Sequence, residues 1–149
     1  MVAHEMAVSY LNDWLAKIDS GIKLATFALQ EGELKDAAFL LHQATERAYI
    51  CSLLVRTFYF PRSHNIKFLR SLAEDGEPRL IEAWPRENRI DRRRFELLKR
   101  AYVEARYSAS YEISVDDLAV IFKSVRTLRG IVETVSRERI ETLRIEAGL

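Results

Sequence analysis

Apolar side chains recur every three or four residues along most of this chain, which predicts amphipathic helices rather than strands. The first run covers residues 3–30 and places its apolar positions on one face: Leu11, Leu15, Ile18, Ile22, Ala25 and Leu29. The second run, residues 34–59, is apolar on most sides at residues 37–41 and 48–55. A helix of that kind packs in the middle of a bundle, so we expect it at the centre of the fold.

Prolines and capping residues divide the next part of the chain. Pro61 ends the second helix, because the residue before a proline is pushed out of helical geometry. Ser63 is the expected cap of a third helix over residues 65–73, and residues 80–84 form one or two helical turns before Pro85. This region therefore contributes shorter helices between longer ones.

Two longer helices follow. One covers residues 88–108, and the other begins after Ser114, whose hydroxyl suits a helix cap. The last helix has one apolar face: Leu118, Ile121, Phe122, Val125, Leu128, Val132 and Val135. We predict an all-α fold, an antiparallel up-and-down helical bundle of four main helices plus a short helix. We expect a single domain over residues 1–149, with the charge-rich end from about residue 137 projecting into solvent.

Composition narrows the classes of function. The net charge of +1 argues against a protein that coats nucleic acid through bulk charge. The single cysteine, Cys51, rules out an internal disulfide and indicates a reducing, cytoplasmic setting. No apolar run reaches membrane-spanning length, and the sequence has neither metal-ligand spacing nor a glycine-rich phosphate loop. We therefore expect no metal ion and no cofactor.

Two ionisable residues interrupt the apolar second helix. His42 and Glu46 are one helical turn apart and share a face, and burying either costs free energy unless it has a partner. A glutamate beside a histidine raises the pKa of the imidazole and orients the ring. The pair forms either a polar pocket with acid–base function or a buried hydrogen-bonded pair that fixes helix register.

His64 lies at the start of the third helix. It either binds phosphate together with Arg62 or helps to cap that helix.

A basic segment follows Pro85. The fourth helix and its lead-in carry a run of cations: Arg86, Arg89, Arg92, Arg93, Arg94, Lys99, Arg100 and Arg106. The run either tracks a phosphate backbone, with Tyr102, Tyr107 and Tyr111 near enough to stack bases, or forms a solvated face with intrahelical ion pairs.

Arg106 differs from the other cations of this run. It lies beside Ala105, close to the core-facing stripe, where a guanidinium needs an anion, a carbonyl or a stacking partner. Glu46 is one candidate for that partner. The alternatives are a structural ion pair and a ligand-binding arginine.

Three segments, residues 37–49, 61–64 and 105–111, together resemble the HEPN domain family. The resemblance spans residues 33–135 and is closest to the HEPN domains fused to, or encoded beside, a nucleotidyltransferase domain. It implies a helical bundle that pairs into a homodimer. The family includes ribonucleases, often the toxins of toxin–antitoxin pairs, and members that bind nucleotides or RNA without cutting.

The ribonucleases of that family carry an arginine and a histidine with four to six residues between them, at the dimer cleft. Here Arg106 stands for the arginine, but Tyr111, Glu112 and Ile113 occupy the places of the histidine. The motif is incomplete, which favours a protein that is not an enzyme.

Three hypotheses follow. The first is a module that dimerises, works with a nucleotidyltransferase partner and binds a nucleotide or RNA through six residues: His42, Glu46, His64, Arg106, Tyr107 and Tyr111. The second is a metal-independent ribonuclease toxin, in which Arg106 is catalytic and the base comes from His42, His64 or a tyrosine. The third is a structural dimerisation module.

Overall fold

The computed structural model describes residues 2–149, and within that range the regular elements are all helices. They are α1 (Ala3–Gln30), α2 (Leu34–Thr57), α3 (Ile66–Gly76), the 3-10 helix η1 (Pro78–Ala83), α4 (Arg89–Tyr107) and α5 (Val115–Glu146). The prediction of an all-α bundle is confirmed. No helix in the described part of the chain is both long and apolar enough to cross a membrane.

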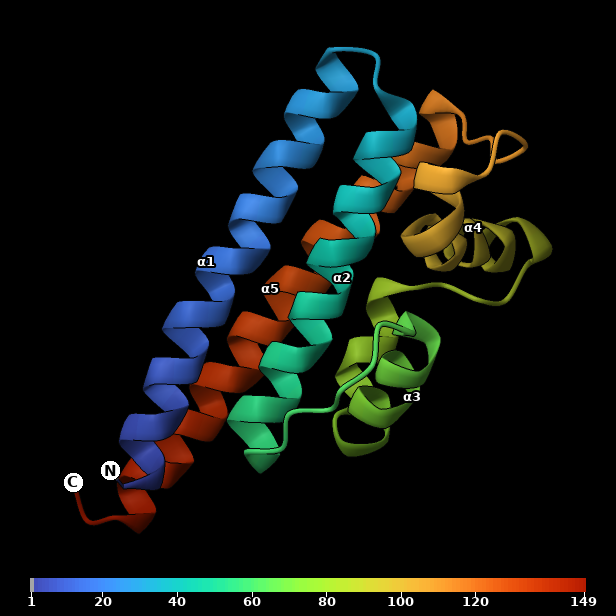
Figure 1. Ribbon diagram of the computed structural model, residues 1–149. Coiled ribbons are helices and arrows are strands. Elements are labelled where there is room, and N and C mark those ends of the chain that lie inside the picture. The colour runs from blue at the N-terminus through green and yellow to red at the C-terminus, as the bar shows by residue number, and fades with distance from the viewer. Residues whose placement is uncertain (1) are drawn as a thin grey trace.

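Three long helices form the body of the molecule. Figure 1 shows α1 running antiparallel to α2 and α5, with the N and C termini at the same end. The shorter α3 and α4 pack on one side, and α4 lies across the direction of the long helices. The last helix continues to Glu146, and Leu143 within it is buried at 8% exposure.

The second helix occupies the centre of the bundle, as its apolar pattern predicts. Side chains on all of its faces are buried, including the polar His42, Thr45 and Glu46. Close packing against α1 depends on Gly21, since a Cβ atom built there would lie 3.3 Å from the Cβ of Ala44. The two helices therefore hold their side chains in a fixed mutual register.

The ends of two helices bear on the site. Phe58 ends α2 because it adopts a left-handed backbone conformation (φ 60°), so the helix stops before Tyr59. The expected Ser63 cap of α3 is wrong, because Asn65 is the cap and its Oδ1 accepts hydrogen bonds from the backbone N–H groups of Lys67 and Phe68. The Ser63 hydroxyl instead accepts from the N–H of Asn65. The chain between α2 and α3 is thus anchored at both ends.

Candidate functional site

A hydrogen-bonded pair of side chains, Glu46 and His64, lies at the centre of the candidate site. Glu46 projects from α2 and is 7% exposed, whereas His64 lies in the segment before α3 with its side chain 60% exposed. Their Oε1 and Nδ1 atoms are 2.8 Å apart. Glu46 therefore pairs with His64. The sequence had suggested His42, on the same helix, or Arg106 as its partner, and Glu46 pairs with neither of them.

The ring of Tyr102, from α4, contacts side chains from two other parts of the fold, α2 and the segment before α3. His64 stacks on it at a centroid distance of 4.7 Å, and His42 does so at 5.2 Å. Phe39 lies at 6.3 Å in a near-parallel orientation. We call these four residues the Tyr102 stack. It brings His42 and His64 against one platform, although they are far apart in the sequence.

Arg106, which is exposed, packs against the Tyr102 stack. Its guanidinium carbon lies 4.3 Å from the centroid of the Phe39 ring, and its Nη2 donates to the backbone carbonyl of Tyr102 at 2.9 Å. It also lies 5.0 Å from the centroid of the Tyr107 ring, a side chain that is 76% exposed. The predicted need for a partner is met by aromatic faces and a carbonyl, which leaves the Arg106 charge available to an anion.

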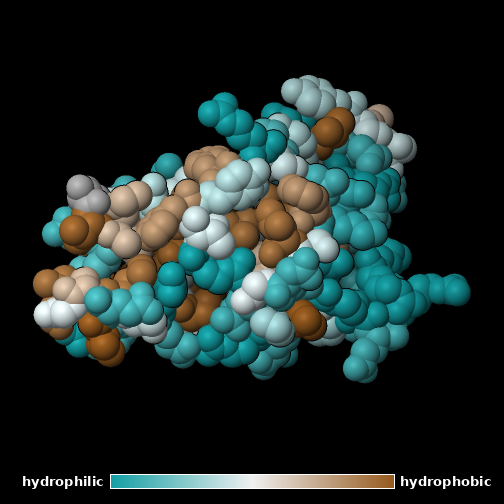
Figure 2. Space-filling view, turned by 90° about the horizontal axis from the view of Figure 1, so that it is seen from below, coloured by the Kyte–Doolittle hydropathy of each residue, from teal (hydrophilic) through white to brown (hydrophobic). Residues whose placement is uncertain are grey.

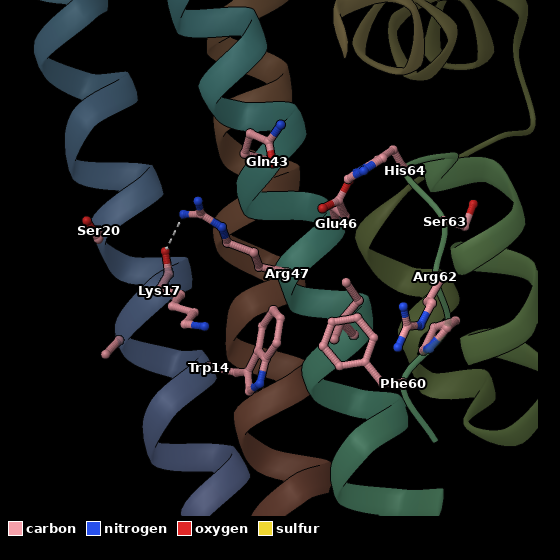
Figure 3. Close-up of a pocket in the computed structure, with 13 residues that line it drawn as sticks. Trp14, Lys17, Ser20, Gln43, Glu46, Arg47, Phe60, Arg62, Ser63 and His64 are labelled. Atoms are coloured by element: carbon pink, nitrogen blue, oxygen red, sulfur yellow. Dashed lines mark hydrogen bonds and ion pairs between the residues drawn. The ribbon is translucent and has the colours of Figure 1, made fainter. Parts of the chain in front are cut away.

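A groove of about 830 Å³ opens on the other side of His64, between α1, α2 and the segment that joins α2 to α3. Figure 3 shows Glu46 and His64 pointing toward each other at one end of the groove, with the rings of Trp14 and Phe60 lower in the view. The Trp14 and Phe60 rings make an edge contact with centroids 5.5 Å apart. The groove therefore has an aromatic wall.

Three cations line this same groove: Lys17, Arg47 and Arg62. Arg47 is held in place by donating to the backbone carbonyl of Lys17 at 3.0 Å, and the Lys17 ammonium lies 4.5 Å from the centroid of the Trp14 ring. The only carboxylate in the lining is Glu46, which already pairs with His64. Cations beside aromatic faces suit a ligand that carries both phosphate and a planar base.

A comparison with protein-family models shows to which family this chain belongs. The family model of the HEPN domain matches residues 11–136, which is most of the chain. The chain belongs to the HEPN domain family. HEPN domains commonly dimerise, and membership supports a nucleotide- or RNA-related role at the level of the family. A search of curated proteins found no match.

His42 is more buried in this HEPN domain, and has a lower pKa, than its spacing from Glu46 suggests. It is fully buried, and neither ring nitrogen makes a hydrogen bond of normal geometry within the described chain. The pKa of His42 is lowered to about 4, chiefly by burial; the backbone of His64 opposes this shift, and the charges of His64 and Arg106 contribute smaller parts of it. The expected rise in its pKa is therefore wrong, because the glutamate that would cause it faces another histidine.

Tyr111 lies apart from the groove and the Tyr102 stack. It is fully buried, and its hydroxyl donates to the backbone carbonyl of Leu97 at 2.9 Å. Burial raises the pKa of Tyr111 to about 12. This tyrosine, which occupies one place of the family's catalytic histidine, serves the packing of α4 in this chain.

Sequence reasoning missed Trp14, Lys17 and Arg47. Trp14 lies at the edge of the apolar stripe of the first helix and is partly buried, and Lys17 is one turn further on and exposed. A partly exposed tryptophan beside a lysine is an unusual pair on a helix surface and is the signal that was available. Within residues 2–149, no cluster of three or more His, Cys, Asp or Glu residues could hold a metal ion.

Proposed function

We propose that this HEPN domain binds a nucleotide or RNA in the groove that ends at the Glu46–His64 pair. The observation that carries the proposal is the combination, in one groove, of three cations with an aromatic wall and a single carboxylate that is hydrogen-bonded to His64. By this proposal the domain acts as a homodimer and works with a nucleotidyltransferase partner.

Each part of the groove has a role in this proposal. Arg62 and Arg47 bind phosphate oxygens, because guanidinium groups present paired donors that match them. Trp14 and Phe60 offer faces and edges on which a base can stack, which contributes about 1–3 kcal/mol per base. His64, oriented by Glu46, donates to or accepts from the sugar or the base.

Titration calorimetry that measures the binding of ATP, GTP and a short single-stranded RNA tests this proposal. Arg62→Gln is expected to weaken binding by roughly tenfold, because a charge-assisted hydrogen bond to phosphate contributes about 1.5–3 kcal/mol. Trp14→Leu is expected to weaken it by a similar factor through lost stacking. Lys35→Gln, an exposed charge on α2 outside the groove, is the matched control. Absence of binding by the unaltered protein would refute the proposal.

A second candidate function is metal-independent RNA cleavage. The observation that favours it is that His64 and Arg106 lie against the same Tyr102 ring, with Glu46 orienting His64. His64 would take the proton from a ribose 2′-hydroxyl as that oxygen attacks the adjacent phosphorus. Arg106 would stabilise the charge that develops on the phosphoryl oxygens, and the departing 5′-oxygen would take a proton from water.

An RNA cleavage assay separates the two candidates. Under the second, His64→Ala and Arg106→Ala each lower the cleavage rate by at least about a hundredfold, as expected for loss of an acid–base group or a charge stabiliser. Binding of RNA without any cleavage by the unaltered protein would remove the second candidate and leave the first intact.

A further inference from the structure

A second cavity, of about 420 Å³, lies between α3 and the start of α4, beside the segment that precedes α4. Six cations line it: Lys67, Arg70, Arg86, Arg89, Arg92 and Arg93. Glu96 is the one carboxylate in the lining. Part of the basic run that the sequence displays is therefore gathered around a single hollow.

Three of these cations are fixed by bonds to other groups. Arg86 makes two hydrogen bonds to Glu74, at 2.8 and 2.7 Å, and Arg93 pairs with Asp117 at 2.9 Å. Arg92 donates to the backbone carbonyls of Arg86 and of Glu87. These contacts hold the cationic groups at the rim and reduce the conformational entropy that a ligand would have to remove.

The other three cations have no carboxylate partner within the described residues. Lys67 and Arg89 are exposed and form no ion pair. Arg70 is half-buried, with its guanidinium carbon 3.8 Å from the centroid of the Phe95 ring. The pKa of Arg70 is lowered, first by burial and next by the charge of Arg86. The cavity thus holds positive charges that repel one another, and a bound anion would relieve that repulsion.

The position of the cavity relative to the groove specifies the kind of anion. Lys67 lies in the first turn of α3, three residues after His64, which lines the groove. Figure 1 shows α3 and α4 on the same side of the long helices. The start of α3 therefore separates two cationic hollows. A mononucleotide would occupy only one of them, whereas a strand lying along the start of α3 would present phosphates to both.

We propose that the cavity between α3 and α4 binds backbone phosphates of a single-stranded RNA whose neighbouring nucleotide lies in the groove at His64. This inference rests on the proposed function of the groove and names its ligand as a strand. Lys67 and Arg89 are the residues with free charge, and Arg70 lies beneath them on Phe95. The contacts are to phosphate, so the cavity contributes affinity and little sequence preference.

Fluorescence anisotropy with labelled single-stranded RNA of increasing length, and with AMP as the short limit, tests this inference. The variant is the double substitution Lys67→Gln and Arg89→Gln, which removes two charges that make no ion pair. Its matched control is Lys23→Gln and Lys35→Gln, which removes two exposed charges from α1 and α2 outside both cavities. Inorganic tripolyphosphate serves as a competitor that lacks sugar and base.

The expected result is a loss of roughly tenfold in affinity for the longer RNA, with AMP affinity unchanged. The slope of log affinity against log salt should fall by about 1.4, since each phosphate contact with a single strand contributes about 0.7. The control variant should match the unaltered protein. The circular dichroism spectrum and melting temperature of each variant establish that it is folded.

Three results would overturn the inference, each in a distinguishable way. If the Lys67/Arg89 variant binds long RNA as the control does while AMP still binds, the groove acts alone and only the strand proposal fails. If tripolyphosphate binds but RNA does not compete with it, the cavity takes free polyphosphate instead. If neither AMP nor RNA binds the unaltered protein, the proposed function fails together with this extension of it.

Discussion

Tyr102 offers one ring to side chains that the sequence keeps far apart. His42 and Phe39 reach it from α2, His64 from the segment before α3, and Arg106 from the next turn of α4. Stacked planar groups of this kind are rigid and have few rotamers, so their ordering is largely complete before a ligand binds. The ring thus acts as the support on which the candidate site is assembled.

Tyr111→Phe should lower the free energy of unfolding by about 0.5–1.5 kcal/mol, because it removes the buried hydroxyl that donates to the carbonyl of Leu97. Tyr107→Phe is the matched control, since that hydroxyl is on an exposed side chain, and its effect should stay within about 0.5 kcal/mol. Urea denaturation measures both. Equal effects of the two substitutions would contradict the structural role of Tyr111, and so would any loss of nucleotide affinity in Tyr111→Phe alone.

His42 should make the stability of the protein depend on pH. Its pKa is about 4 in the folded protein and about 6.5 in an unfolded chain, so the unfolded chain binds a proton first as the pH falls. The free energy of unfolding is therefore unaffected by His42 above about pH 6.5. It falls as the pH drops toward about 4, by about 3 kcal/mol at most. His42→Phe keeps a ring against Tyr102 and should flatten this part of the profile.

The measurement for His42 is the free energy of unfolding in urea across that pH range. Phe39→Leu is the control, because it removes a contact with the same tyrosine without removing a titrating group. It should shift stability by a similar amount at every pH. An unchanged slope in His42→Phe would mean that burial of His42 is not what makes stability depend on pH.

At the scale of the element, α3 matters for the site through its first turn. Asn65 caps the helix, and the residue just before it is His64, so the cap fixes where the imidazole enters the site. Cations at both cavities, Arg62 and Lys67, lie within three residues of this cap. A short helix of this kind depends on its cap and on packing more than on intrinsic propensity.

Asn65→Ala should lower the free energy of unfolding by about 1 kcal/mol, because two backbone N–H groups lose their acceptor. Amide hydrogen exchange at Lys67 and Phe68 should accelerate by more than elsewhere in the chain. Ser63→Ala removes an acceptor that lies outside the helix and should cost less. If exchange at these amides were unaffected by Asn65→Ala, the cap would not be what orders the start of α3.

The elements themselves were predictable from the sequence because amphipathic helices carry a periodic signal. The central place of α2 followed from its apolar faces, and Ser114 caps α5 as predicted, accepting from the N–H of Asp117. Asn65 and Ser63 are equally good capping residues, so composition did not distinguish them. The partner of Glu46 depends on the path of the chain between α2 and α3. That segment is irregular, so no periodic pattern in the sequence predicts its path.

At the scale of the molecule, a net charge of +1 hides an uneven distribution. Cations concentrate around the groove and around the cavity between α3 and α4, while Glu31, Glu33 and Asp36 line a separate hollow at the turn between α1 and α2. Figure 2, which views the end of the bundle where the termini lie, shows apolar side chains gathered between hydrophilic ones. The net charge of the chain therefore does not indicate where its cations gather.

The proposed homodimer makes a prediction about the whole molecule. The midpoint of thermal unfolding should rise with protein concentration over roughly a hundredfold range, because unfolding of a dimer releases two chains. Differential scanning calorimetry at several concentrations measures this, with sedimentation velocity at the same concentrations as the independent check. A constant midpoint together with a single sedimenting species of one chain's mass would show that the protein is a monomer.

His64 belongs both to the lining of the groove and to the Tyr102 stack, because it contacts Glu46 and also lies against the Tyr102 ring. A ligand in the groove that shifts this imidazole would also change the packing on Tyr102, and with it the surroundings of Arg106. Linkage then requires reciprocity: the factor by which an occupant of the groove alters affinity for an anion at Arg106 equals the factor by which that anion alters affinity in the groove. One histidine side chain can in this way couple the groove to Arg106.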